Sequence, residues 1–407
     1  MILKLEQKSP QISGSVRITG SKSESNRLLL LQSLFGNFEI NNLSNSDDSE
    51  VMQRALASTK KTVDIHHAGT AMRFLTAYFA AYEGRETLLT GSSRMKERPI
   101  GLLVEALREL GADITYAEQE GFAPLLIKGK KLKKNKVSLA ANVSSQYISA
   151  LMMVGASLEN GLEIELLGKI TSVPYIEMTR SLLTQLGIKS KFEGQLIQIY
   201  SAENVSVSQM TVESDWSSVS YYYGLVALAE TAKLKLSSYK KESLQGDAVL
   251  VDLYEKLGVK TTFLDNEIFL EKQGGKLPAH VSFDLANSPD IAQTIAVTCF
   301  GLGISCDLTG LHTLKIKETD RLEALKAELT KLGATLSVTN DSLHLKAGGE
   351  YIKNVTVKTY QDHRMAMAFA PLALRVPIIF EDAEVVNKSY PDFWADFRGL
   401  GFKTEQL

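Results

Sequence analysis

Cations and hydroxyl groups gather in the segment GSKSESNR, residues 20–27, immediately before the apolar run LLLLQSLF. Ser21 and Glu24 have the S-x-x-E spacing of a capping box, so one interpretation is an ordinary helix start. The backbone N–H groups of a helix start also attract anions, and Lys22 and Arg27 add a point charge and a planar fork suited to phosphate or carboxylate. Both interpretations remain open from this segment alone.

Other polar turns lead into helices that are rich in small and apolar residues. They are HHAGTAMRFL (66–75), NVSSQYISALMM (142–153), SDWSSVSYYYGL (214–225), ANSPDIAQTIAV (286–297) and YQDHRMAMAFAPL (360–372). We expect these weakly charged helices to be buried on most faces, with their N-termini at one rim that favours anions. Arg27, Arg73 and Arg364 fall near first turns, where a buried arginine needs an anionic partner: a ligand, or an Asp or Glu of a neighbouring repeat.

Two further segments have a high density of charge. TGSSRMKERPIG (90–101) places Arg94, Lys96, Glu97 and Arg98 before a proline that can open a helix, and LKIKETDRLEAL (314–325) places four charges at a helix start. The alternative is a surface salt-bridge helix, since Glu318 and Arg321 have the i, i+3 spacing of an ordinary surface pair.

These segments lie within a repeated pattern, in which a helix that ends in the residues Leu-Gly (LG) is followed by a strand. The repeat spans about 70 residues, which is too long for a usual solenoid. Each glycine of the LG pair suits the left-handed residue that ends a helix: Gly111, Gly187, Gly258, Gly333 and Gly401. A second mark, an apolar helix followed by a short turn and a strand, occurs six times, so we predict six copies of one α/β unit. The first copy has no LG hairpin and is predicted to have lost it.

Composition excludes several classes of protein. The 407 residues carry a net charge of −2, which argues against a dedicated nucleic-acid binder, and KGKKLKKNK (128–136) is predicted to be a solvated loop or hairpin. Only Cys299 and Cys306 are present, so neither a disulfide framework nor a cysteine metal site is expected. The absence of a signal-like start and of an 18-residue apolar run favours a cytoplasmic protein without a membrane partner.

Seven motifs together resemble one family. GSKSESNRLLL, AGTAMR, TGSSRMKERPIG, SSQY, KETDRL, DHRMAMAF and NKSYPDF resemble those of 5-enolpyruvylshikimate-3-phosphate synthases, in the family's order from about residue 14 to residue 398. The resemblance implies an α/β fold of two domains, each with three βαβαββ units around a pseudo-threefold axis. The implied domains are 1–20 plus 214–407, and 21–213, with the active site in the interdomain cleft of a monomer.

The resemblance also implies a reaction. The enolpyruvyl group of phosphoenolpyruvate passes to the 5-hydroxyl of shikimate-3-phosphate, phosphate is released, and no metal or organic cofactor takes part. The catalytic candidates are Lys22, Asp290 and Glu318. The residues implied for shikimate-3-phosphate are Lys22, Ser23, Arg27, Ser144, Ser145, Gln146, Ser172, Asp290, Thr313 and Lys317. The residues implied for phosphoenolpyruvate are Lys22, His67, Gly69, Arg94, Gln146, Arg321, Arg364 and Lys388.

This chain departs from the family pattern at three positions. His67 and Thr313 stand where the family usually has asparagine, and Phe74 stands where a proline is common. A histidine can donate a hydrogen bond, but its charge depends on pH, so we expect activity that is sensitive to mildly acidic conditions.

Two alternatives compete with this function. A UDP-N-acetylglucosamine enolpyruvyl transferase shares the fold but usually carries a cysteine in the loop that matches residues 90–101, where this chain has none. A non-catalytic phosphometabolite-binding protein would not need the acid–base candidates Asp290 and Glu318.

Overall fold

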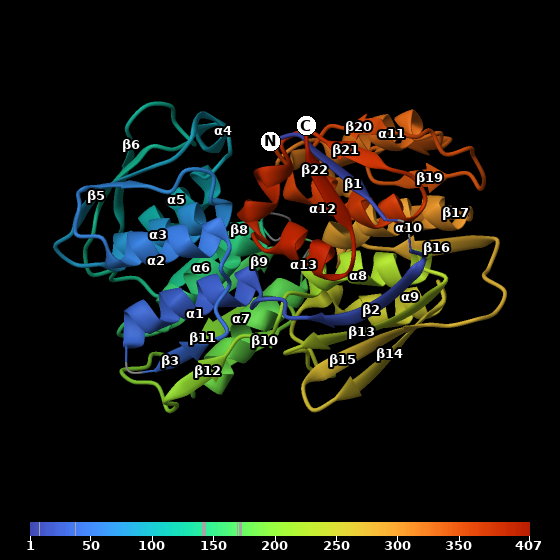
Figure 1. Ribbon diagram of the computed structural model, residues 1–407. Coiled ribbons are helices and arrows are strands. Elements are labelled where there is room, and N and C mark those ends of the chain that lie inside the picture. Colours follow the sequence, from blue (N-terminus) through green and yellow to red (C-terminus); the bar gives the residue numbers. More distant parts are fainter. Residues whose placement is uncertain (8, 37, 141–143, 169, 171–172) are drawn as a thin grey trace. The chain divides into compact units, whose positions relative to one another are not determined.

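A computed structural model describes residues 1–407 except 8, 37, 141–143, 169 and 171–172 (Figure 1). The chain divides into two compact units. Unit 1 comprises Met1–Thr19 and Glu213–Leu407, and unit 2 comprises Gly20–Val212. No described helix is long and apolar enough to cross a membrane.

Unit 2 contains two complete βαβαββ copies. One copy runs through β4 (Thr62–Asp64), α3 (Gly69–Ala81), β5 (Glu86–Thr90), α4 (Ser93–Lys96), α5 (Gly101–Glu109), β6 (Asp113–Tyr116) and β7 (Leu125–Lys128). The next runs through β8 (Lys136–Ala140), α6 (Ser145–Gly155), β9 (Leu162–Leu167), α7 (Val173–Gln185), β10 (Ser190–Glu193) and β11 (Leu196–Ile199). Their sheets have the orders β4-β5-β7-β6 and β8-β9-β11-β10.

The remaining copy of unit 2 is the shortened one. It consists of α1 (Lys22–Phe35), β3 (Glu39–Asn41), α2 (Asp47–Ala57) and the late strand β12 (Gln209–Thr211). In the described part of the chain, β3 pairs only with β12, in parallel, and no closing hairpin follows α2. The predicted loss of a hairpin from the first copy is therefore confirmed.

Unit 1 contains three complete copies. The first runs through β2 (Gln11–Val16), α8 (Trp216–Leu228), β13 (Thr231–Ser237), η1 (Gly246–Val249), α9 (Leu250–Glu255), β14 (Val259–Leu264) and β15 (Glu267–Lys272). The second runs through β16 (His280–Asp284), η2 (Pro289–Ile291), α10 (Ala292–Leu302), β17 (Ser305–Thr309), η3 (His312–Ile316), α11 (Arg321–Lys331), β18 (Leu336–Val338) and β19 (Leu343–Leu345). The third runs through β20 (Val355–Val357), α12 (His363–Phe369), η4 (Ala370–Leu374), β21 (Ile378–Phe380), η5 (Ala383–Lys388), α13 (Phe393–Gly399), β22 (Lys403–Gln406) and β1 (Leu3–Glu6).

The N-terminal strands complete sheets that are built mainly from distant segments. β1 lies between β21 and β22 and is antiparallel to both, as the blue strand among red elements in Figure 1 shows. β2 pairs in parallel with β13. In each four-stranded sheet, two parallel strands are extended by two antiparallel strands. A helical crossover joins the parallel strands of the other sheets, but between β2 and β13 the chain also runs through the whole of unit 2.

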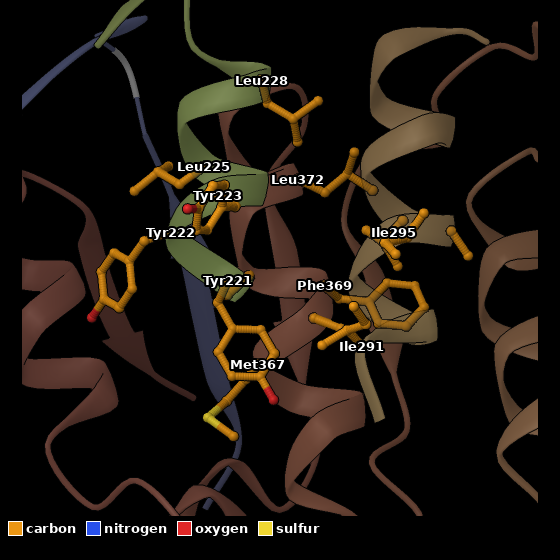
Figure 2. Packing of buried hydrophobic residues seen from close by; sticks show 14 of the residues in the cluster. Tyr221, Tyr222, Tyr223, Leu225, Leu228, Ile291, Ile295, Met367, Phe369 and Leu372 are labelled. Atoms are coloured by element: carbon orange, nitrogen blue, oxygen red, sulfur yellow. The ribbon is translucent and has the colours of Figure 1, made fainter. Parts of the chain in front are cut away.

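Three helices form the centre of each unit and pack on one another: α1, α3 and α6 in unit 2, and α8, α10 and α12 in unit 1. Figure 2 shows Leu228 of α8 facing Leu372 of η4, and both side chains lie against Gly301 of α10. Twelve of the thirteen α3 residues are buried, as are all seven of α12, which confirms the predicted burial of these helices. Their starts, with polar residues beside an apolar stem, carry most of the candidate site residues.

The five LG glycines all adopt the predicted left-handed backbone. Their φ angles lie between 82° and 107°, and each follows the last helix of its copy. At Gly333, a Cβ would lie 2.1 Å from the carbonyl oxygen of Glu350, so both the conformation and the space require glycine.

Candidate active site

A cluster of charges in unit 1 lies where three segments begin helices. Asp290 belongs to η2 before α10, Lys317 and Glu318 precede α11, and Arg321 is the first residue of α11. Arg364 follows Asp362, the N-cap residue of α12, whose carboxylate accepts a hydrogen bond from the Arg364 backbone N–H. Short polar turns thus bring these charges from three helix starts to one place.

Arg321 is the centre of this cluster and is only 2% exposed. Its Nε donates to Asp362 at 2.6 Å, and its Nη1 donates to Asp290 at 2.8 Å. Its Nη2 donates to Glu318 at 2.8 Å. Burial lowers the pKa of Arg321, but the Asp362, Glu318 and Asp290 carboxylates raise that pKa by more, so the guanidinium stays charged. The alternative of an ordinary surface Glu318–Arg321 pair is wrong: the pair forms, but around a buried guanidinium.

Asp290 binds three cations. Its carboxylate lies 2.8 Å from Arg321, 3.2 Å from Arg364 and 3.5 Å from the Lys317 ammonium. Glu318 shares Arg321 with it, so the two acid–base candidates are brought to one guanidinium. The expected anionic partner of Arg364 is therefore a carboxylate of the neighbouring repeat.

Other predicted residues of unit 1 lie around this cluster. Lys388 donates to the Gln361 carbonyl at 2.8 Å, next to the N-cap turn of α12. The Thr313 hydroxyl and the Arg364 Nε are buried and have no hydrogen-bond partner among the described residues. Unsatisfied buried polar groups of this kind are uncommon and are often found where a ligand binds.

Arg27 of unit 2 is also 2% exposed, but its partners are neutral oxygens. It donates to the Thr179 hydroxyl at 2.7 Å, the Ser23 carbonyl at 2.8 Å and the Ser149 hydroxyl at 2.9 Å. Burial lowers the pKa of Arg27 to about 10, because the charges of Tyr175 and Glu24 offset only part of the desolvation. No Asp or Glu forms a direct ion pair with Arg27 among the described residues.

Arg73 of α3 is also buried and hydrogen-bonded to neutral oxygens. It donates to the carbonyls of Gly69 and Pro99, both at 3.2 Å. Burial, with the nearby charge of Arg98, lowers the pKa of Arg73 to about 10. The alternative that acidic side chains neutralise all three arginines therefore holds only for Arg364.

The helix starts of unit 2 place several predicted residues together. Gln146 in α6 donates to the Thr70 hydroxyl of α3 at 3.1 Å, which connects the start of α6 to that of α3 beside Gly69. Ser144 is the N-cap residue of α6, and its hydroxyl accepts from the Gln146 N–H. Ser145 is buried and begins α6.

Lys22 and Ser23 begin α1 and are partly exposed. Ser21 is the N-cap residue of α1, but its side chain makes no capping hydrogen bond, so the Ser21 half of the predicted capping box is absent.

The remaining predicted residues are less closely packed. Arg94 has 58% of its side chain exposed and pairs with Glu97 at 2.6 Å. His67 is exposed, and its charge lowers the pKa of Asp47, although burial raises that pKa by more. Ser172 lies outside the described residues.

Sequence reasoning missed several participants. Asp362 lies inside the quoted motif DHRMAM, and its position one residue before a helix was a usable N-cap signal. Ser149 and Thr179 carried no such signal, because they are ordinary mid-helix hydroxyls that are 122 and 152 residues from Arg27 along the chain.

Comparison with known proteins gives one consistent result. The family model described as EPSP synthase (3-phosphoshikimate 1-carboxyvinyltransferase) matches residues 53–397. A 3-phosphoshikimate 1-carboxyvinyltransferase of Bacteroides fragilis is 45% identical over 397 residues, covering 96% of each chain. The enzyme of the same name from Haemophilus influenzae is 36% identical over 427 residues, again covering 96% of each chain.

Two solved structures share the fold. An EPSP synthase from Acinetobacter baumannii has a TM-score of 0.79 at 20% identity and covers all of both chains. The enolpyruvyl transferase NikO from Streptomyces tendae has a TM-score of 0.76 at 15% identity, covering 100% of this chain and 98% of the other. The predicted enolpyruvyl transferase fold is confirmed.

Proposed function

The chain belongs to the EPSP synthase (3-phosphoshikimate 1-carboxyvinyltransferase) family, and from this premise we propose the reaction that it catalyses. The enolpyruvyl group of phosphoenolpyruvate is transferred to the 5-hydroxyl of shikimate-3-phosphate, and phosphate is released. This reaction belongs to the shikimate pathway. We also propose that the enzyme acts as a monomer in the cytoplasm, which size-exclusion chromatography and cell fractionation test.

The observation that carries the mechanism is the pair of carboxylates on one buried guanidinium. Asp290 and Glu318 each lie 2.8 Å from Arg321. The addition step needs a base for the 5-hydroxyl and an acid for the methylene carbon of phosphoenolpyruvate. Asp290 and Glu318 fill these two roles, and Lys22 is a further proton donor.

Electrostatic stabilisation supports the same step. Addition of the 5-hydroxyl oxygen to C2 and of a proton to C3 gives a tetrahedral intermediate that still carries phosphate and carboxylate. The residues we assign to these anionic groups are Arg321, Arg364, Lys388, His67, Gly69, Arg94 and Gln146. Loss of a methyl proton and expulsion of phosphate then form the product.

Binding of phosphoenolpyruvate has a consequence for the carboxylates. An anion that takes the Nη donors of Arg321 competes with Asp290 and Glu318 for the same N–H groups. A carboxylate that loses a cationic partner has a higher pKa and becomes a stronger base. Substrate binding therefore prepares both groups for proton transfer.

Shikimate-3-phosphate is bound by hydroxyl and cationic groups. The residues we assign to it are Lys22, Ser23, Arg27, Ser144, Ser145, Gln146, Ser172, Asp290, Thr313 and Lys317. The unpartnered Thr313 hydroxyl and the buried Arg27 guanidinium, which no carboxylate contacts among the described residues, support this assignment.

The test is phosphate release by Arg321→Lys. Lysine keeps the charge but cannot hold three carboxylates with a planar fork, so the rate should fall roughly a hundredfold or more. Arg180→Lys is the matched control, because Arg180 also pairs at 2.7 Å with a carboxylate three residues away but lies outside the proposed site. Activity of Arg321→Lys that equals the Arg180→Lys control would contradict the proposed mechanism.

A further inference from the structure

The hydroxyl groups of Ser149 and Thr179 hold the guanidinium of Arg27, and the Thr179 hydroxyl bonds in turn to the Tyr175 carbonyl. We call these three groups the Arg27 clamp. Ser149 belongs to α6, Thr179 to α7, and both are fully buried. The Arg27 Nε lies 2.7 Å from the Thr179 hydroxyl, and its Nη2 lies 2.9 Å from that of Ser149. Because Arg27 itself is in α1, the clamp connects three helices of unit 2.

The direction of each hydrogen bond in the clamp follows from the number of hydrogens. The Thr179 hydroxyl donates its single hydrogen to the Tyr175 carbonyl at 2.9 Å. The 2.8 Å contact between Ser149 and Thr179 is therefore donated by Ser149. Thr179 then accepts from Ser149 and from the Arg27 Nε, which fills both of its lone pairs.

With these donors and acceptors assigned, the guanidinium can make its hydrogen bonds to the clamp in one orientation. Ser149 accepts from Nη2 and donates onward to Thr179, and the Ser23 carbonyl takes one hydrogen of Nη1 at 2.8 Å. The rings of Phe74 and Tyr175 lie 5.5 and 5.9 Å from the Arg27 Cζ. One of the two Nη1 hydrogens has no acceptor in the described part of the chain.

Neutral partners fix this side chain without neutralising it. Arg321 shows the contrast, since three carboxylates hold its fork. Arg27 therefore stays positively charged in the clamp and retains one N–H donor for an anion. The hydrogen bonds of the clamp also hold its side chain in one rotamer.

We propose that Ser149 and Thr179 are positioning residues that orient Arg27 toward an anionic group of shikimate-3-phosphate, an inference that rests on the proposed function of Arg27 as a ligand of that substrate. Neither hydroxyl touches the substrate. Their effect on binding passes through the guanidinium alone.

The variants that test this are Thr179→Val and Ser149→Ala, with Thr179→Ser as the conservative variant that keeps the hydroxyl. Thr76→Val is the matched control. Thr76 is equally buried, and its hydroxyl also bonds the carbonyl four residues earlier, Met72, at 2.7 Å, but it holds no guanidinium. Any general effect of removing a buried helical hydroxyl therefore appears in Thr76→Val as well.

Two readouts are measured on each full-length variant. In ¹⁵N-arginine spectra, assigned with Arg27→Lys, the Arg27 Nε–H of the parent should exchange slowly with water, and Thr179→Val should lose this protection. In steady-state kinetics, Thr179→Val and Ser149→Ala should raise KM for shikimate-3-phosphate roughly tenfold, the size expected for a hydrogen bond to a charged group. KM for phosphoenolpyruvate should change much less, and Thr179→Ser and Thr76→Val should stay near the parent in both readouts.

Several results would overturn the inference. They are an unprotected Arg27 Nε–H in the parent, equal effects of Thr179→Val and Thr76→Val on KM, or equal rises of both KM values. If the parent shows no turnover but a slowly exchanging Nε–H that is lost in Thr179→Val, the clamp stands and the proposed function fails. If Thr179→Val does not fold, Ser149→Ala gives the same comparison.

Discussion

Buried arginines near helix starts have different electrostatic environments in this protein. Arg321 is surrounded by carboxylates, whereas Arg27 is held by hydroxyl and carbonyl oxygens. The positions of these arginines were predictable, because polar turns before apolar helices mark them in the sequence. Their partners were not predictable, because most lie on other segments, and a guanidinium can donate hydrogen bonds to carbonyl oxygens as well as to carboxylates.

Asp247 should make stability depend on pH. Burial, with the nearby charge of Asp290, raises the pKa of Asp247 to about 7. Between the unfolded pKa, about 4, and the folded value, the native state binds more protons than the unfolded state, so this carboxyl lowers stability as pH rises. Asp247→Asn should therefore raise the urea midpoint, relative to the parent, by more at about pH 8 than at about pH 5. Equal differences at both pH values would contradict this cause.

His67 should make phosphoenolpyruvate binding depend on pH. Its side chain is exposed one residue before the N-cap of α3, and a histidine gains charge as pH falls through about 6.5. The parent should therefore show a falling KM for phosphoenolpyruvate in that range, and His67→Asn should lose this step. Overlapping pH profiles of parent and variant would rule out a role for the His67 charge.

At the scale of the element, the sequence predicted the repeats well. The LG glycines marked the end of the last helix in each complete copy, because only a left-handed residue allows the hairpin to follow directly. The missing hairpin of the first copy was also predictable from its length. The placement of β1 and β12 was not, because each completes a sheet with strands from the far end of its unit, and local pattern carries no such information.

Two glycine substitutions separate backbone strain from steric contact. Gly303 ends α10 with φ 72° and has no atom within 4 Å of the place that a Cβ would take, so Gly303→Ala should cost only the left-handed penalty of about 1–2 kcal/mol. At Gly333, where φ is 103°, the Glu350 carbonyl oxygen occupies the place that a Cβ would take. Gly333→Ala should therefore lower the free energy of unfolding by at least twice as much as Gly303→Ala. Urea unfolding measures both, and equal losses would show that the Glu350 backbone yields freely.

At the scale of the whole molecule, the chain leaves unit 1 after Thr19 and returns to it at Glu213. Unit 2 is therefore continuous, whereas unit 1 is assembled from two segments. The fragment 213–407 lacks β1, which lies between β21 and β22, and β2, which pairs with β13.

This arrangement predicts unequal fragments. Residues 20–212 expressed alone should unfold cooperatively in urea, because all their sheets are internal. Residues 213–407 alone should not, because one sheet loses an interior strand and another an edge strand, and fusing residues 1–19 through a flexible linker should restore the transition. Cooperative unfolding of 213–407 without residues 1–19 would contradict this account.

Fold and reaction class were both predictable because seven motifs recur in family order, and one family model matches residues 53–397. The geometry around each motif was not, since the hydrogen bonds that orient Arg27 and Arg321 depend on tertiary packing. The assignment of the substrate depends on both the motifs and these hydrogen bonds.

The most direct test of that claim is phosphate release from phosphoenolpyruvate, with shikimate-3-phosphate or UDP-N-acetylglucosamine added in parallel. Phosphate should be released only with shikimate-3-phosphate. Release only with the UDP-sugar would contradict the substrate assignment, and no release with either, from folded protein that still binds phosphate esters, would contradict the proposed enzyme activity.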